Sequence, residues 1–279
     1  MYEIVYREDI AAKIHLFRIA APAVARKAQP GQFVMVRASD HSERIPLTVA
    51  DFDREAGTVT VVFMEVGHTT TEMAALRQGD YVQNFVGPLG NPTEIEKFGT
   101  VMVVGGGFGT ATLLPVVRGM REAGNRVITV IGFRTKDLIF YEDKLRAASD
   151  ELIVSTDDGS YGYKGVVTLP IKEMLESGRK IDRVIAVGPA IMMKFVSKTT
   201  EPFGVPTIVS LNPIMVDGTG MCGGCRVTVG GQTKFVCVDG PEFEGHLVDW
   251  DILFARQRLY LEEEKHALEE HECRLAKVK

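Results

Sequence analysis

The sequence contains no uninterrupted apolar run of membrane-spanning length, and Met1 leads directly into a strand-like pattern instead of a signal peptide. Its 32 basic and 37 acidic residues are interspersed, with a net charge of −5, so no surface for nucleic acid is indicated. None of the six histidines has metal-ligand spacing, and no Ser/His/Asp or Cys/His set indicates covalent catalysis. We therefore expect a cytoplasmic protein with no membrane insertion, no nucleic-acid partner and no catalytic side chain.

Cysteine is also scarce, but three of the four cysteines lie in one short segment. Cys222, Cys225 and Cys237 fall within the 21 residues that begin at Asp217, and glycines separate them. Thiolates favour iron–sulfur clusters or zinc. Zinc ribbons normally carry a second C-x2-C pair, which is absent, and disulfides need an oxidising compartment that the sequence does not indicate. The pattern favours a [2Fe–2S] cluster over the alternatives, which are zinc or disulfides.

A [2Fe–2S] cluster needs four protein ligands, so one ligand besides the three cysteines is required. Cys273 lies near the end of a charged C-terminal segment, and we predict that it is an inert thiol. Asp217 stands five residues before Cys222, where a glycine-rich loop can turn its carboxylate toward an iron. A carboxylate is a harder ligand than a thiolate and should change the reduction potential. The predicted metal ligands are Asp217, Cys222, Cys225 and Cys237.

Length and pattern predict two domains followed by a C-terminal extension. At 279 residues the chain is long for one domain. Residues 1–98 contain short strand patterns at Ile14–Ala20, Phe33–Arg37 and Thr58–Met64, which predict a small antiparallel β-barrel. The turn-rich segment Gly87–Pro92 marks its end.

Residues 99–211 alternate strand and helix patterns, which predicts a doubly wound parallel sheet. A buried strand at Val101–Val104 is followed by the glycine loop Gly105–Ala111 and an apolar helix over Thr112–Ala123. The further strands are expected at Val127–Phe133, Glu151–Ser155, Arg183–Val187 and Thr207–Leu211. The glycine loop after the first strand is where a nucleotide should bind, although it is not a strict G-x-G-x-x-G.

Residues 212–249 form the cluster segment, in which Arg226–Cys237 predicts a hairpin turning at Gly230–Gly231. This hairpin would bring Cys237 beside the Cys222 loop. Residues 250–279 predict a long C-terminal helix. Ile252, Leu259 and His266 form one heptad row, and Leu261, Leu268 and Leu275 form a second. Its acidic run at Glu262–Glu264 is read as a solvated face, with partner docking as the sharper alternative.

Two segments of the barrel and two loops of the second domain have the composition of cofactor sites. Arg44–Thr48 offers a cation and a hydroxyl, and Glu65–Thr71 offers a glycine and three hydroxyls before a helix expected at Glu72–Leu76. Ordinary turns are the alternative for both. Asp157 and Asp158 follow the third strand and can accept hydrogen bonds from ribose hydroxyls. Their charge would repel a 2′-phosphate, which favours NAD over NADP.

An opposite indication comes from Arg134 and Lys136 at the end of the second strand, because their charges suit a phosphate. The loop that starts at Gly188-Pro189 follows the fourth strand, again at an edge where open α/β sheets bind ligands.

With these motifs in place, the chain resembles the plant-type ferredoxin reductase superfamily. Within it, the resemblance is to the small subunits of NADH-dependent reduced ferredoxin:NADP oxidoreductases, also described as sulfide dehydrogenase small subunits. The electron-transfer subunits of dihydroorotate dehydrogenase are near relatives that use four cysteines, and their first cysteine corresponds to Asp217 here. The resemblance rests on Arg44–Thr48, Gly105–Ala111, Thr156–Ser160, Gly188-Pro189 and the Asp217/Cys222/Cys225/Cys237 set.

One motif departs from the superfamily pattern. Its flavin motif is R-x-Y-S, with arginine three residues before the hydroxyl, whereas Arg44 lies four residues before Thr48 and Leu47 replaces the tyrosine. The resemblance therefore implies an aliphatic contact to the flavin on that side.

The resemblance implies FAD, NAD(H) and a [2Fe–2S] cluster as cofactors. The implied FAD contacts are Arg44, Pro46, Leu47, Thr48, Phe63, Met64, Glu65, Thr69 and Thr70. The implied NAD(H) contacts are Gly105, Gly106, Gly107, Gly109, Thr110, Asp157, Asp158, Gly159, Gly188 and Pro189.

The implied function is hydride exchange between NAD(H) and FAD, with single electrons passing through the cluster to another polypeptide. The implied partner is a larger flavoprotein subunit that carries FAD and [4Fe–4S] clusters, in a complex where electron bifurcation links NADH, NADPH and ferredoxin. Three alternatives remain open at this point: an electron-transfer subunit with a dihydroorotate dehydrogenase partner, a self-sufficient sulfide or polysulfide reductase, and a zinc-stabilised binding module without enzymatic activity.

Overall fold

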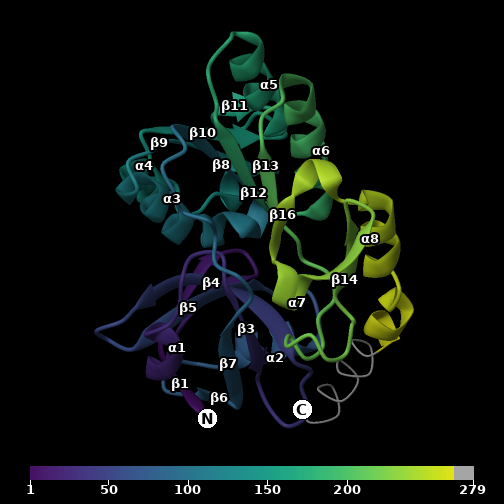
Figure 1. The fold of residues 1–279 in the computed structure, drawn as a ribbon. Helices are drawn as coiled ribbons and strands as arrows, with labels where there is room; N and C mark the ends of the chain where they lie inside the picture. The colour runs from purple at the N-terminus through teal and green to yellow at the C-terminus, as the bar shows by residue number, and fades with distance from the viewer. Residues whose placement is uncertain (267–279) are drawn as a thin grey trace.

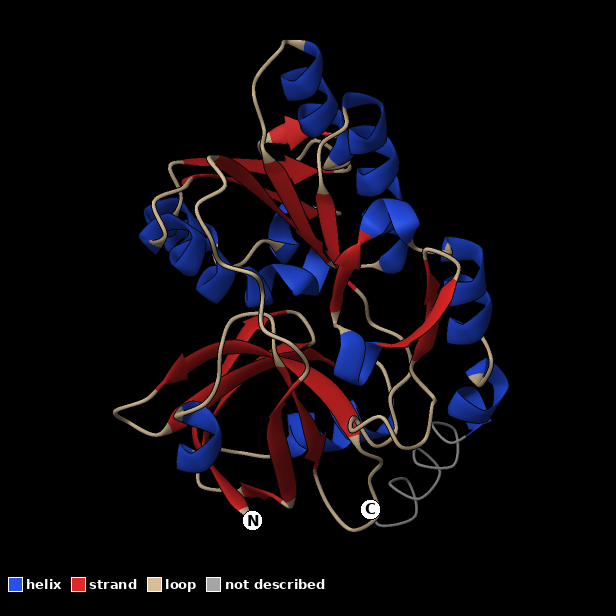
Figure 2. Ribbon diagram, viewed as in Figure 1, coloured by secondary structure: helices blue, strands red, loops and turns tan. Residues whose placement is uncertain are grey.

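The computed structural model describes residues 1–266 of the chain. Two β-sheets stand one above the other, and the C-terminal segment runs alongside both (Figure 1, Figure 2). Within the described residues, no helix is long and apolar enough to cross a membrane. The prediction that Cys273 is an inert thiol falls outside the described residues.

The lower sheet is antiparallel throughout and curls into a half-barrel, which confirms the predicted class of the first domain (Figure 2). Its strands are β1 (Tyr2–Ala11), β2 (Ile14–Ala20), β3 (Phe33–Arg37), β4 (Ile45–Asp53), β5 (Thr58–Met64), β6 (Tyr81–Val82) and β7 (Asn84–Leu89). They pair in the order β6-β1-β2-β5-β4-β3-β7. Two helices accompany the sheet, α1 (Pro22–Ala25) and α2 (His68–Ala75).

Two local predictions for the barrel need correction. An ordinary turn was the alternative for the segment Arg44–Thr48, but β4 begins at Ile45, and Pro46 lies opposite Met35 of β3. A proline is tolerated there because β4 pairs with β5 only from Val49 onward, which leaves one side of Pro46 outside the ladder. Helix α2 begins at His68, earlier than the expected start at Glu72.

The upper sheet is parallel except for its last strand and confirms the predicted doubly wound α/β class. Its strands are β8 (Thr100–Gly106), β9 (Arg126–Phe133), β10 (Glu151–Thr156), β11 (Tyr163–Lys164), β12 (Arg183–Val187), β13 (Thr207–Ser210) and β16 (Glu242–Glu244). They pair in the order β11-β10-β9-β8-β12-β13-β16. The strands before β8 in this order appear with falling numbers and those after it with rising numbers, so the winding of the chain switches between β8 and β12. Doubly wound sheets bind ligands at such a switch point.

Alternate residues of β8 face opposite sides of the sheet, and each side is covered by helices. Val101 and Val103 belong to a core shared with α3 (Leu113–Glu122) and α4 (Glu142–Ala148). Met102 and Val104 belong to a core shared with α5 (Thr168–Glu176) and α6 (Ala190–Thr200). A strand buried on both faces is continuously apolar, which explains the run at Val101–Val104. The helix predicted from Thr112 begins one residue later, after the 3₁₀ segment η1 (Gly107–Thr112).

The cluster segment contacts both domains. Its hairpin consists of β14 (Arg226–Val229) and β15 (Gln232–Phe235) and turns at Gly230–Gly231 as predicted. Cys237 follows in the short helix α7 (Val236–Asp239). The segment then returns to the upper sheet, because β16 pairs antiparallel with β13. At its other end it packs on the barrel, since a β-carbon on Gly218 would lie 2.6 Å from Met35 Cγ.

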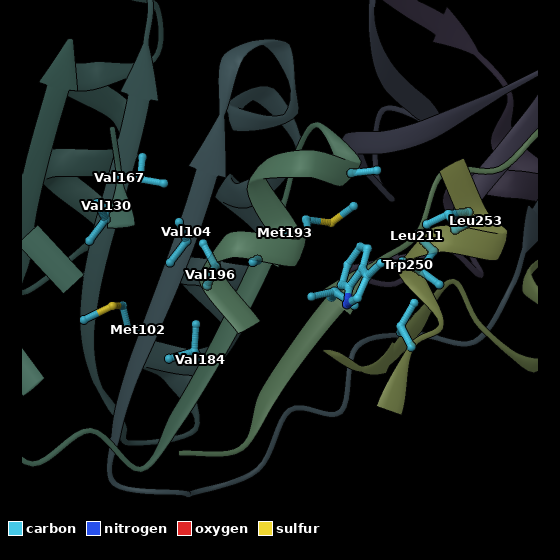
Figure 3. Close-up of a cluster of buried hydrophobic side chains, with 14 of the residues drawn as sticks. Met102, Val104, Val130, Val167, Val184, Met193, Val196, Leu211, Trp250 and Leu253 are labelled. Atoms are coloured by element: carbon cyan, nitrogen blue, oxygen red, sulfur yellow. The ribbon is translucent and has the colours of Figure 1, made fainter. Parts of the chain in front are cut away.

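The predicted helix over residues 250–279 is interrupted. Helix α8 (Trp250–Gln257) is followed by a turn at 258–260 before helix resumes at 261–266. Trp250 and Leu253 of α8 extend the core under α6, as Figure 3 shows beside Met193 and Val196. The expected heptad row is wrong, because Ile252 and Leu259 are exposed and contribute no buried face.

Glu242 joins the cluster segment to the linker between the two sheets. Thr93 lies in that linker, and its Oγ1 donates a hydrogen bond to Glu242 Oε1 at 2.6 Å. Burial is the main reason that the pKa of Glu242 lies above its ordinary value of 4.5, and the Thr93 hydrogen bond opposes the shift. The junction therefore holds a carboxyl group whose ionised form is disfavoured by burial.

Replacing Glu242 with glutamine is expected to stabilise the folded chain relative to the parent at high pH but not at low pH. A carboxyl group whose pKa is raised by folding destabilises the folded state once the pH exceeds its unfolded pKa, and glutamine removes that ionisation while keeping the acceptor for Thr93. We expect equal free energies of unfolding near about pH 4 and a gain of about 1 kcal/mol near about pH 8. Denaturant titrations measure the difference, and a gain that is constant across this range would contradict it.

Candidate functional site

A pocket opens between the two domains and is also bordered by the cluster segment. The barrel contributes residues of β3, β4 and β5, and the upper domain contributes η1 and the ends of β12 and β13. The cluster segment contributes Asn212, Met215 and Pro241. The lining residues are Phe33, Pro46, Leu47, Thr48, Val62, Phe108, Gly109, Thr112, Val187, Gly188, Ser210, Leu211, Asn212, Met215 and Pro241. Most of these side chains are apolar, so the pocket suits a flat aromatic ligand with few polar atoms.

Glycines let the two loops at the switch point approach closely. A β-carbon on Gly109 would lie 2.8 Å from Gly188 Cα and 2.9 Å from the carbonyl oxygen of Val187. Gly188 has φ +155, and a β-carbon there would lie 3.0 Å from Gly106 N. Since all of these neighbours are backbone atoms that cannot swing aside, larger residues would separate the loops. The predicted glycines 106, 109 and 188 are therefore brought together.

Thr110 carries an unsatisfied hydroxyl beside this glycine loop. The residue is fully buried, and its Oγ1 has no hydrogen-bond partner among the described residues. Thr112, one turn later, donates from its Oγ1 to the carbonyl of Gly109 at 2.9 Å and lines the pocket. A buried hydroxyl without a partner is costly, so the loop fits a ligand or water that completes it. Gly105 and Gly107 flank the same loop, Gly107 with φ +53.

The predicted FAD contacts from the barrel divide into two groups. Pro46, Leu47 and Thr48 line the pocket, whereas Arg44 is exposed and has no hydrogen-bond or ion-pair partner within residues 1–266. The Phe63 side chain is placed in the barrel core, 1% exposed and edge-on to the Phe17 ring at 4.9 Å. Its ring is therefore not available to a cofactor.

The segment after Phe63 is held mainly by internal contacts. Met64 packs against the core of the upper domain. Glu65 Oε1 lies 2.5 Å from His15 Nε2, and the other ring nitrogen of His15 lies 2.6 Å from Asp9 Oδ1. These contacts tie β5 to the first hairpin of the barrel and occupy the Glu65 carboxylate.

The two predicted threonines at the start of α2 also have structural partners. Thr69 Oγ1 accepts a hydrogen bond from Glu43 N at 3.1 Å, which links α2 to the residues just before β4. Thr70 Oγ1 accepts from Gly67 N at 3.0 Å and donates to the carbonyl of Gly67. The hydroxyls therefore shape the loop, and the backbone N–H groups of a helix start are the part suited to an anion.

The acidic pair after β10 is exposed, but its two members differ. Asp158 Oδ1 accepts hydrogen bonds from the Ser160 hydroxyl at 2.7 Å and from Ser160 N at 2.9 Å. These bonds, the hydroxyl first, hold the pKa of Asp158 below its ordinary value. The Asp157 carboxylate has no such partner among the described residues. Gly159, with φ +77, completes the turn. Arg134 lies alongside, because its carbonyl accepts from Asp158 N at 3.3 Å.

The four predicted metal ligands lie in two pairs. Cys225 and Cys237 are both buried at 2% exposure, and their sulfurs are 3.2 Å apart, too far for a disulfide bond of about 2.05 Å. Burial, together with the neighbouring Cys225 sulfur, raises the pKa of the Cys237 thiol. Asp217 Oδ2 accepts a hydrogen bond from Cys222 N at 2.8 Å, so this carboxylate turns into the Cys222 loop. The amide of Thr219 is the main cause that lowers the pKa of Asp217.

A comparison with known proteins identifies this segment. Residues 212–249 match the family model described as the iron–sulfur cluster binding domain of dihydroorotate dehydrogenase B. A Thermotoga maritima homologue of the dihydroorotate dehydrogenase B (NAD(+)) electron transfer subunit is 53% identical over 96% of this chain and 94% of its own length. The corresponding Geobacillus thermodenitrificans subunit is 32% identical over 86% of this chain and 94% of its own length.

The chain belongs to the family of dihydroorotate dehydrogenase B electron-transfer subunits and their homologues. A solved NADH-dependent reduced ferredoxin-NADP oxidoreductase, studied for flavin-based electron bifurcation, superposes with a TM-score of 0.92 at 51% identity over 97% of both chains. A ferredoxin NADP+ reductase from Neisseria gonorrhoeae, with bound FAD and NADP, superposes with a TM-score of 0.60 at 19% identity over 73% of this chain and 90% of that one, which shows the shared fold alone. The predicted family and the predicted role as an oxidoreductase electron-transfer subunit are confirmed.

As a member of this family, the chain has a donor set that fits a two-iron cluster better than a single metal ion. Within residues 1–266, no three His, Cys, Asp or Glu side chains converge on one ion site. A structural zinc ion needs four ligands around one point, whereas a [2Fe–2S] cluster takes two protein ligands at each iron. Two separate pairs, Asp217 with Cys222 and Cys225 with Cys237, satisfy the second requirement. The cofactor prediction of FAD, NAD(H) and a [2Fe–2S] cluster is supported by the iron–sulfur family match and the ferredoxin-reductase-like relatives.

Several pocket residues of this electron-transfer subunit were missed from the sequence. Phe33 lies on a predicted strand, and Asn212, Met215 and Pro241 lie in a segment that was assigned only to the metal. Phe108 lies inside the glycine loop and Thr112 directly follows it, but the predicted contacts of this loop are only its glycines and Thr110. The cross-strand pairing of Ser210 with Glu242 gives no local pattern in sequence, so only Asn212-Pro213, directly after a strand at the ligand-binding edge, offered a signal.

Proposed function

We propose that this subunit exchanges hydride between NAD(H) and FAD in the pocket between its domains and passes single electrons through the cluster to a larger partner subunit. The observation that carries the proposal is the shared lining of that pocket. Pro46 and Leu47 of the barrel, Gly109 and Gly188 of the nucleotide edge, and Met215 of the cluster segment border the same space. Met215 is two residues from Asp217, so the flavin pocket and the proposed ligand loop are contiguous.

The residues of the chain have separate tasks in this scheme. FAD would supply the hydride chemistry and the step from electron pairs to single electrons, and the cluster would carry those single electrons. Pro46 and Leu47 would hold the flavin ring by apolar contact, and Thr48 would offer a hydroxyl at its edge. The unpartnered guanidinium of Arg44 would face the pyrophosphate. Gly109 would let the nicotinamide ring reach the flavin without a side chain between them.

The ribose contact is assigned to Asp157 first. Its carboxylate is exposed and unpartnered among the described residues, whereas Asp158 already accepts two hydrogen bonds from Ser160. A carboxylate here would accept hydrogen bonds from the two ribose hydroxyls of NAD and repel the additional phosphate of NADP. This supports NAD(H) as the nicotinamide cofactor, with Gly159 providing the turn and Pro189 starting the next helix.

The larger partner is proposed to dock over the cluster loop. Val216, Met221 and Val238 are all exposed, Met221 at 88%, and each lies within a few residues of a proposed ligand. An apolar rim around a redox centre suits a protein surface that brings a second centre close. The resemblance of the sequence to small subunits of bifurcating oxidoreductases implies a partner that carries FAD and [4Fe–4S] clusters and connects NADPH and ferredoxin to this arm.

Cofactor analysis of the native complex tests the proposal. We expect one FAD, two irons and two sulfides for each copy of this chain, and anaerobic addition of NADH should bleach the flavin before an electron paramagnetic resonance signal of reduced cluster appears. NADPH at the same concentration should reduce the flavin much more slowly. A complex with zinc in place of iron, or with no flavin on this chain, would refute the proposal.

Replacing Asp217 with cysteine is expected to keep the cluster and lower its reduction potential. A thiolate is a softer and more electron-donating ligand than a carboxylate, so it favours the oxidised irons. We expect two irons for each chain in both proteins and a change of about tenfold in the ratio of reduced to oxidised cluster at one fixed potential. Redox titration followed by paramagnetic resonance measures this, and an unchanged potential and spectrum would remove Asp217 from the ligand set.

A dihydroorotate dehydrogenase partner is the second candidate, because electron-transfer subunits of that enzyme are about a third identical to this chain. The first candidate is favoured by Asp217, which stands where the resemblance places the first cysteine of those subunits, and by the 51% identity to the bifurcating oxidoreductase. Purification of the tagged chain from its natural host separates the two. A dehydrogenase that binds only flavin, and no [4Fe–4S] cluster, would support the second.

A further inference from the structure

The turn between Cys222 and Cys225 is held by two arginines from different elements. Arg226, at the start of β14, donates from Nη1 to the carbonyl of Gly223 at 3.4 Å. Arg256, from α8, donates from Nη2 to the carbonyl of Gly224 at 3.0 Å. Both residues of the C-G-G-C turn that lie between the cysteines therefore present their carbonyls to a guanidinium.

The two arginines differ in burial and in support. The bond from Arg226 is long and exposed, and its side chain lies in water. Arg256 is partly buried, and its Nε is enclosed with no hydrogen-bond partner among the described residues. Helix α8 is anchored firmly, because Trp250 and Leu253 are buried in the core and Trp250 Nε1 donates to Gly245 O at 3.2 Å. Arg256 thus delivers a partly desolvated positive charge on a rigid support.

We propose that Arg256 is a positioning residue that fixes the Cys222–Cys225 turn and raises the reduction potential of the cluster held there. The inference rests on the proposed ligand set. Its guanidinium orients the Gly224 carbonyl, and with it the peptide that precedes Cys225. Its charge stabilises the reduced form, because reduction adds one negative charge to the site and the guanidinium attracts that charge.

Burial decides which of the two arginines matters for the potential. A charge surrounded by protein is screened less than one in water, so its effect on a nearby redox centre is larger. Guanidinium also remains charged at any working pH, so the effect is constant and does not vary with titration. Arg226 reaches the same turn from the solvent side and therefore serves as the matched control.

The test uses the full chain in its native complex and compares R256Q, R256K and R226Q with the parent. Iron content is measured first, and the potential is then obtained by redox titration with paramagnetic resonance detection. We expect R256Q to lower the ratio of reduced to oxidised cluster about tenfold at a fixed potential, which corresponds to about 59 mV for a one-electron couple. R256K should keep most of the parental potential, because it retains the charge, and R226Q should change the ratio less than about twofold.

The outcomes separate this inference from the proposed function. If the parent contains no two-iron cluster, the ligand set fails. If the parent and R256Q both hold two irons and share one potential, the inference about Arg256 fails while the ligand set stands. If R256Q loses its iron, the result for R256K decides. Retained iron with a near-parental potential in R256K supports a role of the charge. An equal loss of iron in R256K, while R226Q keeps its iron, overturns the inference about Arg256.

Discussion

Replacing Cys237 with alanine is expected to abolish the iron–sulfur centre while NADH still reduces the flavin. The Cys237 sulfur is buried and lies 3.2 Å from Cys225 Sγ, so no other described side chain can take its place at that iron. We expect the iron content to fall by more than about tenfold. Even mutation of residues that only hydrogen-bond to metal ligands lowers metal affinity by about 10–100-fold. Iron assay, flavin assay and stopped-flow reduction by NADH measure the three quantities separately.

The control for this change is Cys273→Ser, which also removes one thiol. We expect it to keep two irons for each chain, because the sequence predicts that Cys273 is not a ligand. Retention of the full cluster in Cys237→Ala, or its loss in Cys273→Ser, would mean that the fourth cysteine belongs to the ligand set. Electron delivery to the partner subunit should disappear in the first variant only, because the path from the flavin pocket to the surface passes through the cluster segment.

The second large effect is expected from Gly109→Val, at the contact between the two loops of the switch point. The β-carbon alone would lie 2.8 Å from Gly188 Cα and 2.9 Å from Val187 O, and both are backbone atoms. The loops must separate, which should cost about 1–3 kcal/mol of unfolding free energy. Because hydride transfer depends on ring positions to within about 1 Å, we expect flavin reduction by NADH to slow by about 100-fold.

A matched control for the backbone is Gly204→Asn. Gly204 follows a short 3₁₀ turn, has φ +63, and has no atom within 4 Å of an added β-carbon. Asparagine tolerates this conformation, so both stability and flavin reduction should stay close to those of the parent. Stopped-flow reduction and denaturant titration are performed on both variants. A normal reduction rate in Gly109→Val would show that the nicotinamide does not depend on this close approach.

Local patterns were sufficient for several of the elements. Strands such as Phe33–Arg37 and Arg183–Val187 were predicted with their observed bounds, because apolar runs between turns are a local signal. The hairpin at Gly230–Gly231 was equally local, since both glycines have positive φ. The start of β4 was missed because Pro46 reads as a break. Only the pairing of residues 45–48 with β3 alone makes a proline acceptable there.

The C-terminal helix shows the limit of periodicity. Ile252 and Leu259 have helical spacing, yet both are exposed, while Trp250 and Leu253 are the residues of α8 that enter the core. A periodic pattern predicts an apolar face on a helix, but whether that face is buried depends on the element that packs against it. The Phe63 side chain illustrates the same point in the barrel, because its place against Phe17 depends on how β5 pairs with β2.

The sequence by itself determined the fold class and the iron–sulfur character of this protein, through three cysteines within 21 residues and a glycine loop after a buried strand. The preference of thiolates for iron–sulfur clusters and the conformational freedom of glycine are properties of the residues themselves, so the sequence alone indicates them. Only the tertiary structure decided that Phe33, Gly109 and Met215 border one pocket and that Arg256 reaches the carbonyl of Gly224, 32 residues away in the chain. Those contacts arise from how sheets and helices pack, and packing joins residues that no local pattern connects.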